Sequence, residues 1–162
     1  MNDLKPIGII HSPFREQSGT PIQPGWGDDP GEGKVEIFED FAEGLADLGG
    51  FERIWLIYRL DRAAPAKLKV IPYRDTVKRG VFATRSPSRP NAIGISCVKL
   101  LGIEGRRLRV AELDILDGTP LLDIKPYSPR FDAWPDVKAG WLDGKGSGRD
   151  SADDRFEGGG EE

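Results

Sequence analysis

Short apolar runs of strand length, separated by segments rich in glycine and proline, decide what this chain can fold into. The 162 residues include 21 glycines and 13 prolines, many of them at expected turns. Runs rich in β-branched and aromatic residues lie at 4–12, 34–38, 54–58, 81–84, 93–101, 108–116 and 121–127, with a possible edge strand at 68–71. Strands and helices do not alternate along the chain. The pattern therefore predicts a mainly β fold, a compact antiparallel or mixed β-barrel with one short accessory helix, unlike a Rossmann fold.

Two of these runs carry further detail. Residues 54–58 are continuously apolar, which predicts a central strand buried on both faces. In the run at 108–116, Leu108 and Val110 share one face, whereas Leu113 and Ile115 share the other. This change of phase predicts a β-bulge near Ala111.

One segment has the pattern of a helix. Asp40 with Glu43 three residues later forms a capping-box pattern, and Phe41, Leu45 and Leu48 follow at helical spacing before two glycines. The apolar stripe is narrow. The helix is therefore expected to pack on one side of a larger unit.

Charge divides the chain unevenly. Residues 143–162 contain seven acidic and three basic residues with a single aromatic one, a composition typical of a disordered tail, so one domain is expected at 1–142. Residues 62–89 hold eight basic residues and one acidic residue. Such a run is typical of a solvated face or mobile loop, and also of a nucleic-acid interface.

Single cysteine and histidine residues limit other chemistry. Cys97 excludes an internal disulfide, and the apolar alternation around it predicts a small core residue. His11 with one distant cysteine cannot form a zinc site, and a polar role at a strand end is expected. No signal peptide and no apolar run of membrane-spanning length is found, so a soluble cytoplasmic protein is expected.

Residues 85–91, Arg-Ser-Pro-Ser-Arg-Pro-Asn, lie between two expected strands. Each proline fixes its own φ and favours an extended residue before it, so the backbone is stiff. Two guanidinium groups on a stiff loop suit a carboxylate or a phosphate, although solvated arginines in an ordinary connection have the same pattern. Arg89 and Asn91 can equally brace the loop.

A second polar cluster contains Asp114, Asp117 and Asp123. Asp117 with Gly118 indicates a turn. Three close carboxylates could hold magnesium, and a turn with a lysine partner explains them equally simply. Asp114, at the end of a strand, could also accept hydrogen bonds from ribose hydroxyls or from an adenine amino group.

Four motifs together resemble the TsaA-like family. They are GVFATRSPSRPNAIGIS at 80–96, LDILDGTPLLDIKPY at 113–127, IGIIHSPF at 7–14 and PIQPG at 21–25. The resemblance spans roughly residues 4–130. It implies a compact β-barrel that binds S-adenosyl-L-methionine, forms a homodimer and methylates the N6 atom of threonylcarbamoyl-adenosine next to the tRNA anticodon. Neither a metal nor a membrane partner is expected.

The resemblance also implies which residues contact the cofactor. They are Gln23, Pro24, Gly25, Trp26, Asp61, Arg62, Arg85, Ile95, Ala111, Glu112, Leu113 and Asp114. Asp117 and Tyr127 are our candidates for the catalytic region, where an acceptor must draw a proton from the adenine amino group. The chain departs from the family at Glu52 and Arg53, where Ser-His is usual, and at Asp61, where a histidine is usual.

Three hypotheses follow. The first is an S-adenosyl-L-methionine-dependent tRNA methyltransferase. The second is the same cofactor pocket acting on a small molecule or a protein. The third is a non-catalytic module that binds S-adenosyl-L-methionine or a nucleotide.

Overall fold

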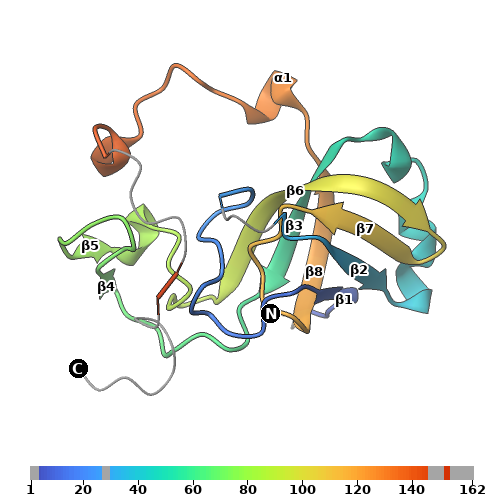
Figure 1. Ribbon diagram of the computed structural model, residues 1–162, viewed down its shortest axis with the longest axis horizontal. Coiled ribbons are helices and arrows are strands. Elements are labelled where there is room, and N and C mark those ends of the chain that lie inside the picture. The colour runs from blue at the N-terminus through green and yellow to red at the C-terminus, as the bar shows by residue number, and fades with distance from the viewer. Residues whose placement is uncertain (1–3, 27–29, 146–151, 154–162) are drawn as a thin grey trace.

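Six strands form a closed antiparallel barrel in the computed structural model, which describes residues 4–26, 30–145 and 152–153 (Figure 1). The strands pair around the barrel in the order β1-β2-β7-β6-β3-β8. Their bounds are β1 Gly8–His11, β2 Gly33–Ile37, β3 Arg53–Arg59, β6 Ile93–Glu104, β7 Arg107–Ala111 and β8 Thr119–Pro126. This architecture confirms the predicted mainly β barrel.

A smaller lobe lies beside the barrel. It contains the two-stranded sheet of β4 (Lys69–Val70) and β5 (Arg79–Gly80), followed by the 3₁₀ helix η3 (Val81–Ala83). The prediction of an edge strand at 68–71 is confirmed by β4. The prediction of a strand at 81–84 is wrong, because residues 81–83 form η3. The reason is local, because both the amide and the hydroxyl of Thr84 donate to the carbonyl oxygen of Val81 and close a turn.

The segment after β8 returns to this lobe. It forms the short helix α1 (Pro129–Asp132) and the 3₁₀ helix η4 (Gly140–Leu142). Figure 1 shows this segment as an arch from the barrel to the vicinity of β5. The predicted tail falls mostly outside the described residues, and the domain boundary expected near residue 142 stays a prediction. Of the tail, Lys145 contacts Asp75, and Ala152 exchanges backbone hydrogen bonds with the loop at 19–20.

The predicted helix after β2 forms, but as two 3₁₀ turns. These are η1 (Glu39–Leu45) and η2 (Leu48–Gly50). No capping box forms, because the residue before η1 is Phe38 and no side chain caps the first turn. Asp47 has a left-handed backbone (φ 66°) that separates the two turns. Leu45 and Leu48 still pack against the core, as the apolar stripe predicts.

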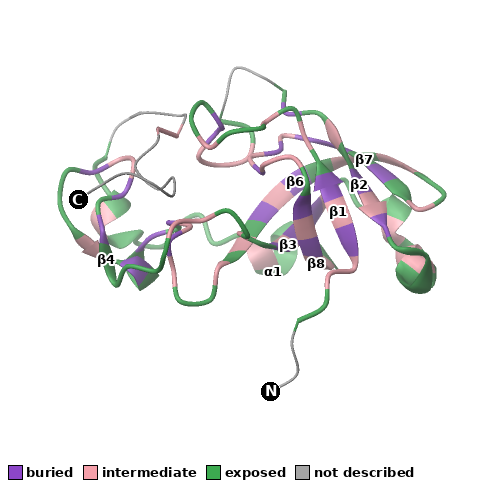
Figure 2. Cartoon of the chain, turned by 90° about the horizontal axis from the view of Figure 1, so that it is seen from below, coloured by how far each residue is buried: buried purple, intermediate pink, exposed green. Residues whose placement is uncertain are grey.

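Strand β3 is buried on one face, so the prediction of burial on both faces is wrong. Ile54, Leu56 and Tyr58 point into the barrel and are buried, whereas Trp55 and Ile57 are partly exposed. Figure 2 shows the same alternation of buried and less buried residues on the barrel strands. A closed barrel has a single interior, so even an apolar strand turns alternate residues outward.

The prediction that Cys97 of β6 is a core residue is wrong, because its side chain points out of the barrel. The inward residues of β6 are Ser96 and Val98, while Ile95 and Cys97 point outward and are not buried. Register explains this result, because Ser96 pairs with the inward-facing Leu56 of β3. Cys97 is therefore not a core residue.

The phase change near Ala111 has another cause than a β-bulge. Strand β7 ends at Ala111, and Glu112 takes a left-handed backbone (φ 65°) that leads the chain out of the sheet. The register shift of this strand pair lies instead on β6, between Leu100 and Gly102. Leu113 and Ile115 are buried against the core after this turn.

The core is built from inward apolar side chains of all six barrel strands and of the segment after β7. They are Ile10, Val35, Ile37, Ile54, Leu56, Tyr58, Val98, Leu108, Val110, Leu113, Ile115 and Leu121. Within 4–26, 30–145 and 152–153, no helix reaches the length and hydropathy needed to span a bilayer.

Candidate functional site

The loop at 85–91 is held by buried hydroxyl groups. The amide of Ser86 donates to the hydroxyl of Thr84 over 3.3 Å, and the amide of Ser88 donates to the hydroxyl of Ser86 over 3.3 Å. All three side chains are buried. Arg89 donates to the carbonyl oxygens of Thr84 (3.1 Å) and Ser86 (3.3 Å), so it braces the loop.

Arg85 points away from this brace toward a second loop. Its Nη1 donates to Oε1 of Gln23 over 2.7 Å. Gln23 belongs to the long glycine- and proline-rich segment between β1 and β2. Two loops far apart in sequence are thereby joined at a guanidinium group.

A cavity of about 420 Å³ opens beside this pair, a size within the range of small-molecule and cofactor sites. Six residues predicted to contact the cofactor line it: Gln23, Asp61, Arg62, Arg85, Ile95 and Asp114. Tyr58, Thr84, Arg89, Ile93, Gly94 and Leu116 also line it. The structure therefore brings together side chains from the loop after β1, the end of β3, the arginine loop, β6 and the segment after β7.

A chain of three side chains ends at the cavity. The hydroxyl of Ser96 donates to Oδ1 of Asp114 over 2.5 Å, so the Tyr58 hydroxyl donates to the Ser96 oxygen, 2.9 Å away. Burial raises the pKa of Asp114 to about 7, against the opposing effects of the Ser96 hydrogen bond and the charge of Arg85. Burial, and then the charge of Asp114, also raises the pKa of Tyr58. Asp114 can therefore gain or lose a proton near neutral pH while Tyr58 stays neutral.

Sequence reasoning did not single out Tyr58 or Ser96. The available signal was a hydroxyl on an otherwise apolar strand, and it becomes informative only when the facing of β6 is known. Once Ser96 is placed inside the barrel, a buried hydroxyl requires partners, and Tyr58 and Asp114 provide them.

Gly94 lets the ring of Tyr58 take this position. The two residues are register partners, and a Cβ atom on residue 94 would overlap the Tyr58 ring. We expect Gly94→Ala to lower the free energy of unfolding by about 1 to 3 kcal/mol, because the ring must move within a packed barrel. Urea unfolding measures the loss. Gly80→Ala is the matched control, since a Cβ there meets open space; equal losses in both variants would contradict the packing described.

The other residues predicted for the cofactor do not line this cavity. Ala111 and Leu113 are buried, and Glu112 pairs with Arg53 over 2.6 Å, which raises the pKa of Arg53. Gly25 lies next to the Glu112 side chain. Pro24 is likewise absent from the cavity lining, and Trp26 lines a neighbouring cavity. Arg53, one of the departures from the family, thus holds the segment that carries Asp114.

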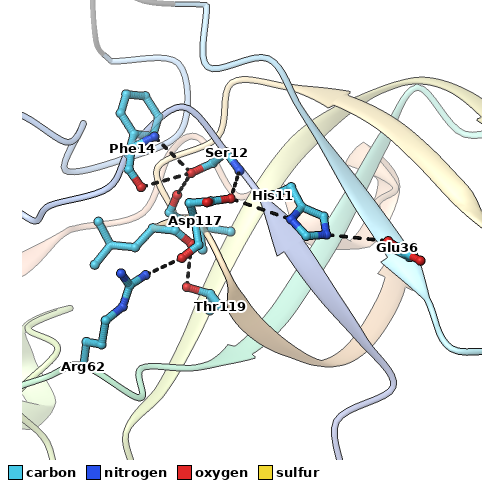
Figure 3. A network of polar contacts seen from close by, with 9 residues as sticks. His11, Ser12, Phe14, Glu36, Arg62, Asp117 and Thr119 are labelled. Atoms are coloured by element: carbon cyan, nitrogen blue, oxygen red, sulfur yellow. Dashed lines mark hydrogen bonds and ion pairs between the residues drawn. The ribbon is translucent and has the colours of Figure 1, made fainter.

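Asp117 takes part in a different network, at the end of β1 (Figure 3). Its Oδ1 accepts from the amide of Ser12 over 3.1 Å, and its carbonyl oxygen accepts from Arg62 over 2.6 Å. His11, the last residue of β1, lies between Asp117 and Glu36, with 3.7 Å to each carboxylate. These contacts support a structural role, and the predicted turn at 117–118 is present.

Tyr127 also lies outside the cavity lining. Its ring packs edge-on against Trp55, with 5.9 Å between the ring centres. The catalytic role of Asp117 and Tyr127 stays a prediction that these contacts do not support. In the described ranges, His, Cys, Asp and Glu side chains form no group of three or more that could hold a metal ion.

Comparison with known proteins adds independent information. The family model of the tRNA-methyltransferase O N-terminal domain matches residues 9–133. A probable S-adenosyl-L-methionine-binding protein of Pyrococcus abyssi is 55% identical over 139 residues, which is 86% of this chain and 75% of that protein. The human tRNA (adenine(37)-N6)-methyltransferase is 36% identical over 135 residues, or 80% of this chain and 31% of that protein.

Solved structures show the same fold. The crystal structure of TrmO from Pseudomonas aeruginosa is similar with a TM-score of 0.73 and 39% identity. The match covers 88% of this chain and 62% of that one. The chain thus spans less than two thirds of that relative's length.

Proposed function

Because the chain belongs to the family of the tRNA-methyltransferase O N-terminal domain, we propose that it binds S-adenosyl-L-methionine in the 420 Å³ cavity and methylates tRNA. One observation carries the proposal. Six residues expected to contact the cofactor come from five separate parts of the chain and line one cavity. The names of the relatives from Pyrococcus abyssi and Homo sapiens support the same cofactor and the same class of acceptor.

The side chains of the cavity match the chemical groups of this cofactor. Arg85 offers a planar pair of donors to the carboxylate of the methionine part. Asp114 offers a carboxylate to its ammonium group or to a ribose hydroxyl. Ile95 supplies apolar surface for the adenine. When bound, the sulfonium supplies the methyl group, and the residues around it bind, orient and keep water away.

The pKa of Asp114 predicts that cofactor affinity depends on pH. In the free protein its carboxyl group is protonated below about pH 7. A cationic ligand favours the ionised form, so binding at lower pH must release this proton and becomes weaker. We expect affinity to fall roughly ten-fold from pH 8 to pH 6, measured by calorimetry at several pH values. The other titratable groups facing the cavity are Tyr58, Asp61, Arg62, Tyr73, Arg85 and Arg89.

Asp114→Asn is the control for this prediction. It removes the titrating group and keeps the shape of the side chain. The variant should bind more weakly than the unchanged protein at pH 8. Its affinity should stay nearly constant between pH 8 and pH 6, where the affinity of the unchanged protein falls roughly ten-fold. Parallel pH profiles for the two proteins would show that Asp114 does not control binding.

We propose the N6 atom of threonylcarbamoyl-adenosine beside the tRNA anticodon as the acceptor. The human relative named for adenine N6 methylation supports this choice. The excess of basic residues at 62–89, which includes the β4–β5 lobe, would attract a nucleic acid. Asp117 and Tyr127 are not part of this proposal, because neither lines the cavity.

The tRNA of a deletion strain tests the acceptor. Liquid chromatography with mass spectrometry should show that the methylated form of the modified adenosine is lost and the unmethylated form accumulates. An unchanged nucleoside profile would contradict the assignment. Transfer of a tritiated methyl group into protein or small-molecule fractions, and not into tRNA, would favour the alternative acceptor class.

The proposal also includes a cytoplasmic homodimer. The arch between β8 and η4 carries three exposed apolar side chains, Phe131, Trp134 and Val137. Such a row is costly to leave in water and is suited to contact with a second copy of the chain.

A further inference from the structure

A second cavity, of about 620 Å³, adjoins the first. Five residues line both: Ile22, Gln23, Tyr73, Thr84 and Arg85. The hydrogen-bonded pair of Arg85 and Gln23 therefore lies in a wall that the two cavities share. A group held in the second cavity would lie next to whatever the first one binds.

Aromatic side chains dominate the second cavity. Trp26, Tyr73, Phe82 and Trp141 all line it. Phe82 is 78% exposed, although it is apolar and sits on the short helix η3. Exposed rings at a cavity, here those of Phe82 and Trp26, are suited to stacking on a flat ligand rather than to supporting the fold.

Two guanidinium groups accompany these rings. Arg74 lies over Trp26, with 4.5 Å from its Cζ to the ring centre, and Arg79 lies over Trp141 at 5.4 Å. With Arg85 in the shared wall, the cavity combines π surfaces with positive charge.

Residues 141–145, at the end of the arch that follows β8, hold one side of the second cavity in place. Trp141 donates its indole N–H to the carbonyl oxygen of Ala83 over 2.8 Å. The Asp75 carboxylate, with no exposed side-chain surface, accepts from Arg79 (2.7 Å) and Lys145 (3.0 Å). Burial alone would raise the pKa of Asp75, but these hydrogen bonds hold it below its usual value. The charged pairs thus join the arch to the lobe that carries the rings.

Stacking rings with nearby cations match single-stranded nucleic acid, whose bases stack on aromatic side chains while the phosphates meet arginines. A purely apolar ligand would use the rings and not the positive charge beside them, and an acidic peptide would use the charge and not the rings. We propose that the second cavity holds the acceptor base of a single-stranded RNA segment. This inference rests on the proposed function, because it places the acceptor beside the donor site at Arg85.

The test uses a fluorescently labelled, single-stranded RNA oligonucleotide containing adenine, with binding followed by anisotropy without cofactor. Trp141→Ala and Phe82→Ala should each raise its Kd roughly ten-fold to a hundred-fold, which is the effect of losing one stacking partner. Trp141→Phe should recover most of the affinity. Phe82 is exposed, so its removal decides the question even if Trp141→Ala does not fold.

Cofactor binding by the same proteins separates this inference from the proposed function. Phe82→Ala should bind S-adenosyl-L-methionine as the unchanged protein does, since Phe82 does not line the first cavity. RNA affinity unchanged in both alanine variants, or no binding of the oligonucleotide at all, would overturn the second cavity as an acceptor site. Absence of S-adenosyl-L-methionine binding in the unchanged protein would instead overturn the proposed function, and the RNA titration would still decide the second cavity.

Discussion

Arg85→Ala is expected to weaken binding of S-adenosyl-L-methionine by about 1.5 to 3 kcal/mol, roughly ten-fold to 150-fold in Kd. Arg85 lines the cavity, and the loop that carries it is braced by Arg89 and by buried hydroxyl groups. Little conformational entropy is then lost when the guanidinium group pairs with a carboxylate. Isothermal calorimetry measures the change directly.

Two further variants serve as controls for the Arg85→Ala measurement. Arg85→Lys keeps the charge but loses the paired donors, so its Kd should lie between those of Arg85→Ala and the unchanged protein. Arg107→Ala removes an exposed arginine of β7 that does not line the cavity, and should bind normally. Wild-type affinity in Arg85→Ala would mean that the cofactor site is misplaced.

Leu56→Ala and Ile95→Ala are expected to separate stability from binding. Leu56 is fully buried in the barrel, so its truncation should lower the free energy of unfolding by about 2 to 5 kcal/mol. Ile95 is 46% exposed and lines the cavity, so its truncation should cost less than about 1 kcal/mol. Urea unfolding and calorimetry on the same samples give both quantities.

Cofactor binding should be affected more by Ile95→Ala than by Leu56→Ala, the reverse of their order in stability. Ile95→Ala should raise the Kd for S-adenosyl-L-methionine, because apolar surface next to the adenine is lost. Leu56→Ala, measured where it is folded, should bind nearly normally. A large loss of stability in Ile95→Ala with unchanged affinity would show that Ile95 faces the core and not the cavity.

The barrel could be predicted from the sequence because alternation and turn residues are local signals. The strand segments at 34–38, 93–101 and 121–127 correspond to β2, β6 and β8. The resemblance to known motifs added six residues that line one cavity, among them Arg85 and Asp114. Alternation alone would not have brought these side chains together.

The two errors about strand facing, on β3 and β6, have a common physical cause, which is that the facing of a strand depends on partners far along the chain. Cys97 was predicted inside because its neighbours alternate, but register with β3 places Ser96 there instead. The left-handed residues Asp47 and Glu112 divide a predicted helix and end a predicted strand. Neither aspartate nor glutamate adopts a left-handed backbone often enough for the sequence to predict it.

The polar chain of Tyr58, Ser96 and Asp114 was out of reach for the same reason. Its members lie on β3, on β6 and after β7, and each is unremarkable in its own segment. Their hydrogen bonds, and the raised pKa of Asp114, follow from the closed barrel, which buries Tyr58 and Ser96 and partly buries Asp114.

Methyl transfer by the purified protein decides whether this chain is a tRNA methyltransferase. The protein would be incubated with S-adenosyl-L-methionine and with tRNA that carries unmethylated threonylcarbamoyl-adenosine. The masses of the nucleosides would then be measured by mass spectrometry. This nucleoside should gain one methyl group, and Arg85→Ala should slow the gain at limiting cofactor. An unchanged nucleoside, with a protein that binds the cofactor and the tRNA, would contradict this expectation.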